Sequence, residues 1–243
     1  MATVILVRHG RSTANVSGVL AGRMAGVHLD DTGVKQSAAV GERLASVRLA
    51  AAITSPLERC RETCREIIRP QAGPLRARAE KQLSECDYGE WQGRPLRELA
   101  KEKLWKTVQS QPSAATFPGG ESLRAMQDRA VAAIRRHDAR VADEHGDDAV
   151  WLAVSHGDLI KSILADALGT HLDLFQRIHV DPASVSIVRY SETRPFVLGT
   201  NTHAGDLSWL TPPRKARRRR RTDAEIGGGA GPDTPAESQT GTS

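Results

Sequence analysis

Residues 4–15 read VILVRHGRSTAN, and this stretch organises the rest of the chain. Residues 4–7 form a short apolar run, too short and too rich in β-branched residues for a helix, so they predict a buried strand. The run is followed at once by a cation, an imidazole and a glycine. A strand with this ending delivers those groups to the carboxyl edge of a sheet, where open α/β folds bind their ligands.

Each of the three residues after the strand suits a site for an anion. Arg8 offers a planar fork of donors that matches a phosphate or a carboxylate. His9 can act as a nucleophile near neutral pH, and Gly10 lets the backbone turn close to a ligand. On these three residues alone, the simpler interpretation is favoured: a strand end with a solvated arginine and a hydrogen-bonded histidine.

Composition indicates a soluble globular protein. The chain has 243 residues, of which 39% are hydrophobic and 26% charged, and it contains no apolar run of the ~20 residues that span a membrane. We see no secretory signal. Three cysteines make an odd count without metal-type spacing, so a disulfide framework is not expected. These features predict a cytoplasmic protein that does not bind a membrane.

The positive charge is concentrated near the C-terminus. Residues 214–243 carry three of the five net positive charges, and their Gly/Pro/Ser/Thr-rich sequence has no apolar periodicity. We therefore expect a domain over residues 1–210 and a disordered basic tail over residues 211–243. The arginine run at 214–221 could bind nucleic acid electrostatically, but no aromatic residues interleave it. A solvated extension is the favoured interpretation.

Strand and helix patterns alternate along the chain. Apolar runs at 50–54 and 149–154 predict two more buried strands, and residues 184–190 and 195–198 predict a hairpin at the sheet edge. Helical spacing or helix-start signals predict helices after Thr32, after Ser55-Pro56, over 96–108, from 121–122 to about 144, and over 158–168. This order predicts an α/β fold with three α/β/α layers, a mostly parallel central sheet, helices on both faces and a small helical lid insertion.

Three of the predicted strands end in residues that suit one anion. His156 and Gly157 follow the strand at 149–154, as His9 and Gly10 follow the first. Arg59 comes one turn into the helix that follows the strand at 50–54, so it should face back to the strand end. Two imidazoles and two guanidiniums around one crevice repel each other unless an anion lies between them. A phosphoryl group, whose oxygens take several donors at once, is the natural candidate.

Transfer of a phosphoryl group from an ester also needs an acid for the leaving alkoxide. Glu85 is the candidate, because it lies in a glycine-rich segment where a carboxyl could be held close to the phosphate. Partial burial would keep it protonated until it is needed. Asn15 and Ser12 could add neutral donors to the phosphate.

The segments that hold these residues resemble the motifs of the histidine phosphatase superfamily, the phosphoglycerate-mutase-like family. The similar segments follow the family's order: VRHGRSTAN at 7–15, SPLERCRET at 55–63, LSECDYGEWQG at 83–93, PGGES at 118–122 and VSHG at 154–157. The resemblance implies a mechanism without a metal or other cofactor. In it, His9 is phosphorylated, Glu85 protonates the leaving group and then activates water, and Arg8, Arg59 and His156 hold the phosphoryl oxygens.

The resemblance leaves three activities to weigh. A phosphomonoester hydrolase acting on a small phosphorylated metabolite is favoured over a phosphoglycerate mutase-type enzyme, because only residues 94–117 separate the proton-donor segment from PGGES, where such mutases usually carry a longer insertion. A non-catalytic phospho-ligand binder is disfavoured because His9 and Glu85 are both present. Many family members have an acid where this chain has Arg11, so either a more anionic substrate or a solvated arginine is expected there. The sequence does not name the substrate, and it is compatible with a monomer or a homodimer.

Overall fold

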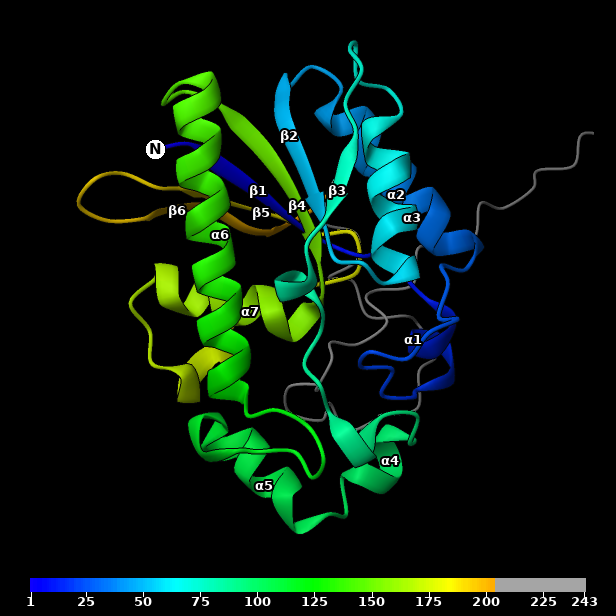
Figure 1. Cartoon of the computed structure of the whole chain (residues 1–243). Coiled ribbons are helices and arrows are strands. Elements are labelled where there is room, and N and C mark those ends of the chain that lie inside the picture. The colour runs from blue at the N-terminus through cyan, green and yellow to red at the C-terminus, as the bar shows by residue number, and fades with distance from the viewer. Residues whose placement is uncertain (204–243) are drawn as a thin grey trace, which may run out of the picture.

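The computed structural model describes residues 1–203. A six-stranded sheet forms the centre of this part of the chain (Figure 1). The strands lie in the order β3-β2-β4-β1-β5-β6. Neighbouring strands among the first four are parallel. β5 pairs antiparallel with β1 on one side and with β6 on the other. Their bounds are Thr3–Arg8 for β1, Leu49–Thr54 for β2, Ala77–Ala79 for β3, Val150–Ser155 for β4, Val185–Arg189 for β5 and Phe196–Thr202 for β6. The predicted mostly parallel sheet is confirmed.

Each face of the sheet is covered by helices. Helices α2 (Asp31–Leu44) and α3 (Glu58–Ile68) share a core cluster with one set of strand residues. Helices α6 (Leu123–His145) and α7 (Gly157–Ala167) share a second cluster with the alternate set. β1 shows the alternation that a strand requires, because Ile5 and Val7 belong to the first cluster and Val4 and Leu6 to the second. The predicted three layers are therefore confirmed.

The carboxyl ends of β1, β4 and β2 meet at one edge of the sheet. Arg8 pairs with Ser155 in the register of β1 and β4, and Thr54 pairs with Val154 in that of β2 and β4. Three short helices lie beyond this edge in Figure 1: α1 (Thr13–Ser17), α4 (Leu96–Leu99) and α5 (Lys103–Ser110). Four 3₁₀ turns complete the described elements, at Lys81–Leu83, Gly89–Trp91, Pro112–Ala114 and Leu172–Arg177.

The insertion differs from its prediction. A single helix was expected over 96–108, but the chain breaks between α4 and α5. Leu99 and Val108 explain the break, since both are buried in the same core. Nine residues are about two and a half turns, so one straight helix would place them on opposite sides. The insertion is also packed into the body of the protein, because Trp91 stacks on Trp105 and contacts Phe117.

Helix starts and two short elements also differ from expectation. Asp30, not Thr32, caps α2, and its Oδ1 accepts the Gly33 N–H at 2.7 Å. Ser55 and Pro56 were expected to open the next helix, but α3 begins at Glu58 without a side-chain cap. Neither α1 nor β3 was anticipated. All three residues of β3 are exposed, so they carry no apolar pattern to read.

The C-terminal part of the described chain agrees with the predicted hairpin. β5 pairs antiparallel with β1, and β6 forms the edge strand beside β5. Within residues 1–203, no helix has the length and apolar character needed to cross a membrane. The expected tail at 211–243 and the arginine run at 214–221 lie outside the described residues, so the domain boundary at 210 stays a prediction.

Candidate active site

His9 lies immediately after the end of β1 and is held there by its backbone. Its N–H donates to the Ser155 carbonyl at 2.9 Å, and the Ala183 N–H donates to the His9 carbonyl at 3.2 Å. The next residue, Gly10, donates its N–H to Thr63 Oγ1 of α3 at 2.9 Å. Only 4% of His9 is exposed. The nucleophile proposed from the sequence is therefore buried between the ends of β1 and β4 and the helix α3.

The proton of His9 can be placed from its hydrogen bond. Nδ1 lies 2.7 Å from the Gly10 carbonyl oxygen, which can only accept, so Nδ1 carries the hydrogen. Burial, followed by the charges of Arg59 and Arg8, lowers the pKa of His9 well below its usual value. At neutral pH the ring is thus neutral, and its Nε2 bears a lone pair. That is the form an imidazole needs to attack phosphorus.

His156 follows β4 and faces His9, with ring centroids 5.3 Å apart in an edge-on arrangement. Arg59 Nη2 donates to its Nδ1 at 3.1 Å, so Nε2 carries the hydrogen and donates to Ser55 Oγ at 2.8 Å. Burial and Arg59 lower the pKa of His156 well below its usual value. Cys60 Sγ packs against the ring, 3.4 Å from Nε2, and burial raises the pKa of that thiol to about 12.

Two buried guanidiniums give the site its positive charge. Arg8 donates to the Val180 carbonyl at 2.9 Å. Burial lowers the pKa of Arg8, but the pKa of an arginine starts so high that the guanidinium stays charged. Arg59, at the start of α3, donates through Nη2 to Gly22 and His156. Its Nη1 is buried and has no hydrogen-bond partner within residues 1–203. A buried guanidinium donor left in this state suits an anionic ligand.

Glu85 is the acid beside these cations, and its residue is only 3% exposed. Burial, helped by the nearby Asp158 carboxylate, raises the pKa of Glu85 to about 7. The Cys86 N–H, which donates to Oε1 at 2.9 Å, and the two arginines oppose the rise. A carboxyl with a pKa in this range can both give and take a proton near neutral pH.

Asp158, at the start of α7, is itself buried in a polar chain. It accepts a hydrogen bond from the Tyr88 hydroxyl at 2.8 Å and lies 3.4 Å from Lys161 Nζ. Lys161 in turn donates to Gln176 at 3.1 Å. These contacts hold a buried carboxylate in place near Glu85, which explains the second largest contribution to the raised pKa.

Ser12 and Asn15 make local contacts with each other. Ser12 is the N-cap of α1 and forms a capping box, in which its Oγ accepts the Asn15 N–H at 3.4 Å and Asn15 Oδ1 accepts the Ser12 N–H at 3.0 Å. Ser12 Oγ also donates to Asn15 Oδ1 at 2.8 Å. Their predicted contacts with a phosphate stay a prediction. Arg11 is partly buried and paired, because its Nε lies 2.7 Å from Asp30 Oδ2 and its Nη2 donates to Thr32 at 2.7 Å.

Comparison with known proteins agrees with this geometry. The family model of the histidine phosphatase superfamily, branch 1, matches residues 4–203. The chain belongs to this superfamily. The match covers every residue that the sequence nominated for the site, from Arg8 to His156.

Relatives in the superfamily include a phosphatase and a mutase-like protein. The chain is 31% identical over 166 residues to phosphoglycerate mutase-like protein 4 of Arabidopsis thaliana, a match covering 67% of this chain and 69% of that protein. It is 29% identical over 211 residues to phosphoserine phosphatase 1 of Hydrogenobacter thermophilus, covering 85% and 96%. The structure of YhfR from Bacillus stearothermophilus has 25% identity and a TM-score of 0.73, covering 82% of this chain and 96% of that one. The superfamily's members are phosphatases or mutases, which supports an enzyme.

Several residues of the site were not anticipated in these roles. Ser55 carried a signal, because it precedes a proline and a helix, but the structure directs its hydroxyl to His156 instead of to the helix. Asp158 was placed only at a helix start. Arg23 and Arg129 had no local signal, since their contacts with Glu85 cross 62 and 44 residues of sequence.

Proposed function

We propose that this protein is a phosphomonoester hydrolase that acts on a small phosphorylated metabolite through a phosphohistidine at His9. The observation that carries the proposal is the bond from His9 Nδ1–H to the Gly10 carbonyl, which leaves Nε2 as a buried, unprotonated nucleophile. Buried cations and a carboxyl with a pKa of about 7 surround it. These are the three components that phosphoryl transfer from an alcohol ester needs.

In the first step, Nε2 of His9 attacks the phosphorus and forms a P–N bond while the ester P–O bond breaks. The leaving oxygen takes the proton of the Glu85 carboxyl and departs as a neutral alcohol. Arg8 and Arg59 stabilise the phosphoryl oxygens, whose charge spreads as the bonds change. His156 joins them by turning its Nε2–H from Ser55 Oγ to a phosphoryl oxygen. Ser12 and Asn15 are proposed to add neutral donors.

In the second step, the Glu85 carboxylate accepts a proton from a water molecule that attacks the phosphorus. The P–N bond breaks, and its electron pair returns to Nε2 of His9. Inorganic phosphate leaves, and both residues regain their starting protonation states. One carboxyl thus serves as acid and then as base, which its pKa of about 7 permits.

Hydrolysis is preferred over phosphomutase chemistry on the length of the insertion. A mutase must keep water away from its phosphoenzyme until the substrate has turned. Residues 94–117 form two short helices and a turn that pack into the body of the protein. A relative named as a phosphoserine phosphatase, of which this chain covers 96%, supports the same choice.

The substitution His9→Ala tests the proposal. We expect it to abolish turnover of p-nitrophenyl phosphate, because the substitution removes the proposed phosphoryl acceptor. The matched control is His28→Ala, since His28 is exposed and paired with Glu62, outside the proposed catalytic set. Turnover by His9→Ala equal to that of the wild type would overturn the proposal.

A further inference from the structure

Glu85 lies in a segment that has little regular structure of its own. The segment joins the turn Lys81–Leu83 to the turn Gly89–Trp91, and residues 84–88 are neither helix nor strand. A loop of this kind would ordinarily be among the more mobile parts of a fold. General acid catalysis requires the opposite, because the carboxyl must lie within hydrogen-bond reach of the leaving oxygen.

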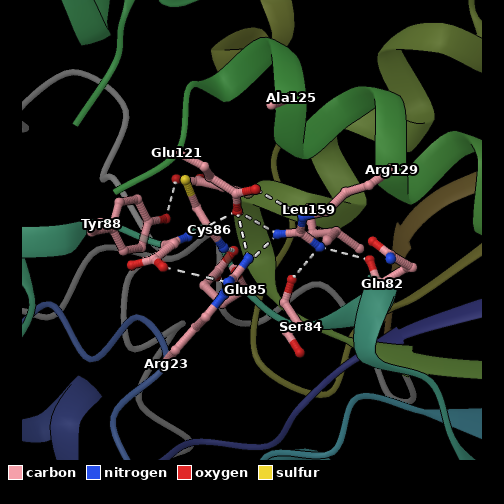
Figure 2. A network of polar contacts seen from close by, with 12 residues as sticks. Arg23, Gln82, Ser84, Glu85, Cys86, Tyr88, Glu121, Ala125, Arg129 and Leu159 are labelled. Carbon is pink, nitrogen blue, oxygen red and sulfur yellow. Dashed lines mark hydrogen bonds and ion pairs between the residues drawn. The ribbon is translucent and has the colours of Figure 1, made fainter. Parts of the chain in front are cut away.

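Arg129 of α6 ties this segment down from one side. Figure 2 shows its guanidinium reaching the backbone of the segment. Nη1 donates to the carbonyls of Gln82 and Ser84 at 2.6 and 2.8 Å, and Nη2 donates to that of Glu85 at 3.0 Å. One side chain therefore binds three carbonyls within four residues of chain.

Arg23 reaches the same backbone from the loop that follows α1. Its Nε donates to the Glu85 carbonyl at 2.9 Å, so that single oxygen accepts from two guanidiniums. Arg23 Nη1 also lies 3.4 Å from Asp87 Oδ2. The two arginines thus hold the main chain of the acid between the loop at 20–27 and the helix α6.

Glu121 holds the two guanidiniums in register. Its Oε2 accepts from Arg129 Nε at 2.9 Å, and its Oε1 accepts from Arg129 Nη2 at 2.6 Å and from Arg23 Nη2 at 2.8 Å. Oε1 also accepts the Asp87 N–H at 2.9 Å. The side chains of Arg129 and Glu121 are only 15% and 17% exposed, so water screens this pair weakly.

We propose that Arg129, together with Arg23 and Glu121, is a positioning residue that fixes the backbone of Glu85 so that its carboxyl reaches the leaving oxygen. The role rests on the phosphatase mechanism proposed above. A guanidinium fits it better than an ammonium, because a planar fork can bind several acceptors in fixed directions. None of these three side chains needs to touch the substrate.

Such a role has a signature that a merely structural role lacks. A p-nitrophenolate is a stable anion and leaves without a proton, whereas an alkoxide needs one. Displacing the acid should therefore slow an alkyl ester and spare the nitrophenyl ester. Loss of folded protein would lower both rates together and leave their ratio unchanged.

The experiment compares kcat/KM for glycerol 2-phosphate with kcat/KM for p-nitrophenyl phosphate. In Arg129→Gln we expect the alkyl-to-aryl ratio to fall about 10- to 100-fold, the cost of displacing a catalytic group by about an ångström. Arg23→Gln should lower the ratio in the same direction, and its more exposed side chain makes it the safer variant for folding. Glu85→Gln sets the lower limit of the ratio.

Arg140→Gln is the matched control, since Arg140 lies on the same helix in an exposed pair with Glu144. Its ratio should equal that of the wild type. The inference is overturned if Arg129→Gln and Arg23→Gln keep the wild-type ratio, whether their rates are unchanged or equally reduced. Failure of the proposed function looks different, because His9→Ala would then hydrolyse p-nitrophenyl phosphate as the wild type does.

Discussion

Burial is the largest cause of the pKa shifts of two residues in this site, and it shifts the two pKa values in opposite directions. His9 and Glu85 are both removed from water, and removal from water disfavours whichever form carries charge. The pKa of the imidazole falls, and the pKa of the carboxyl rises to about 7. The first step of the proposed reaction needs a neutral imidazole and a protonated carboxyl. The same physical cause therefore prepares the nucleophile and the acid.

The raised pKa of Glu85 predicts how activity on an alkyl phosphate depends on pH. Because the protonated carboxyl is the active form in the first step, kcat/KM should decrease as the pH rises through about 7. The lowered pKa of His9 keeps that ring neutral across the same interval, so it adds no change there. A pH–rate profile on glycerol 2-phosphate measures the effect.

Glu85→Gln is the control for this profile. It should remove the decrease near pH 7 and leave a lower, flatter curve, because the amide has no proton to lose. A variant that keeps the wild-type decrease would show that another group is responsible for it.

At the scale of elements, the sequence predicted the strands that are buried on both faces. The apolar runs at 4–7, 50–54 and 149–154 became strands because both faces of β1, β2 and β4 are covered. Their ends brought Arg8, His9 and His156 together with Arg59. β3 escaped prediction because it is exposed, and the break between α4 and α5 because tertiary packing decides it.

The site itself was predictable only in part, for a related reason. Each residue nominated from the sequence follows a strand or lies within a recognisable motif. Arg23 and Arg129 act on Glu85 through contacts between distant segments, and no local pattern encodes such contacts. Glu121 lies in the PGGES segment, but that motif does not reveal its bonds to the two arginines. For Ser55 the local signal was present but misleading. It predicted a helix cap, whereas the Ser55 hydroxyl forms a hydrogen bond with His156.

Two glycines lie where α2 packs against the loop that follows His9, and their close contacts predict an effect on stability. A Cβ on Gly33 would lie 2.0 Å from the Arg11 carbonyl oxygen, and one on Gly10 would lie 2.4 Å from the Gly33 carbonyl oxygen. We expect Gly33→Ala to lower the free energy of unfolding by about 1–3 kcal/mol, because the two backbones must move apart.

Urea denaturation measures this change, and Gly73→Ala is the control. A Cβ on Gly73 meets no atom within 4 Å, so its free energy of unfolding should stay within about 0.5 kcal/mol of the wild type. Equal stability of the two variants would contradict the close contact between α2 and the loop.

For the whole molecule, the residues that the mechanism uses come from both halves of the chain and meet at one edge of the sheet. β1 supplies Arg8 and leads to His9, β2 leads to Arg59, and β4 leads to His156. All of them, with Glu85, lie within the family match over residues 4–203. The proposed catalytic unit is therefore the domain predicted over residues 1–210.

This division predicts the outcome of a truncation. A chain ending at residue 210 should keep the kcat/KM of the full-length protein on p-nitrophenyl phosphate and its thermal midpoint, because no residue of the proposed mechanism lies beyond that point. Kinetics and thermal melts on the two purified proteins check it. A substantial loss of kcat/KM in the shorter chain would place part of the working enzyme in residues 211–243.

The phosphoryl acceptor can be identified directly. Wild-type protein mixed with a slowly hydrolysed phosphate ester and quenched in alkali within one turnover should carry one phosphoryl group on His9. ³¹P NMR of the quenched protein should assign it to Nε2, because Nδ1 is held by the Gly10 carbonyl. His9→Ala, treated identically, should carry none. A rapid turnover that leaves no phosphoryl group on the protein, or leaves one on a residue other than His9, would contradict the mechanism.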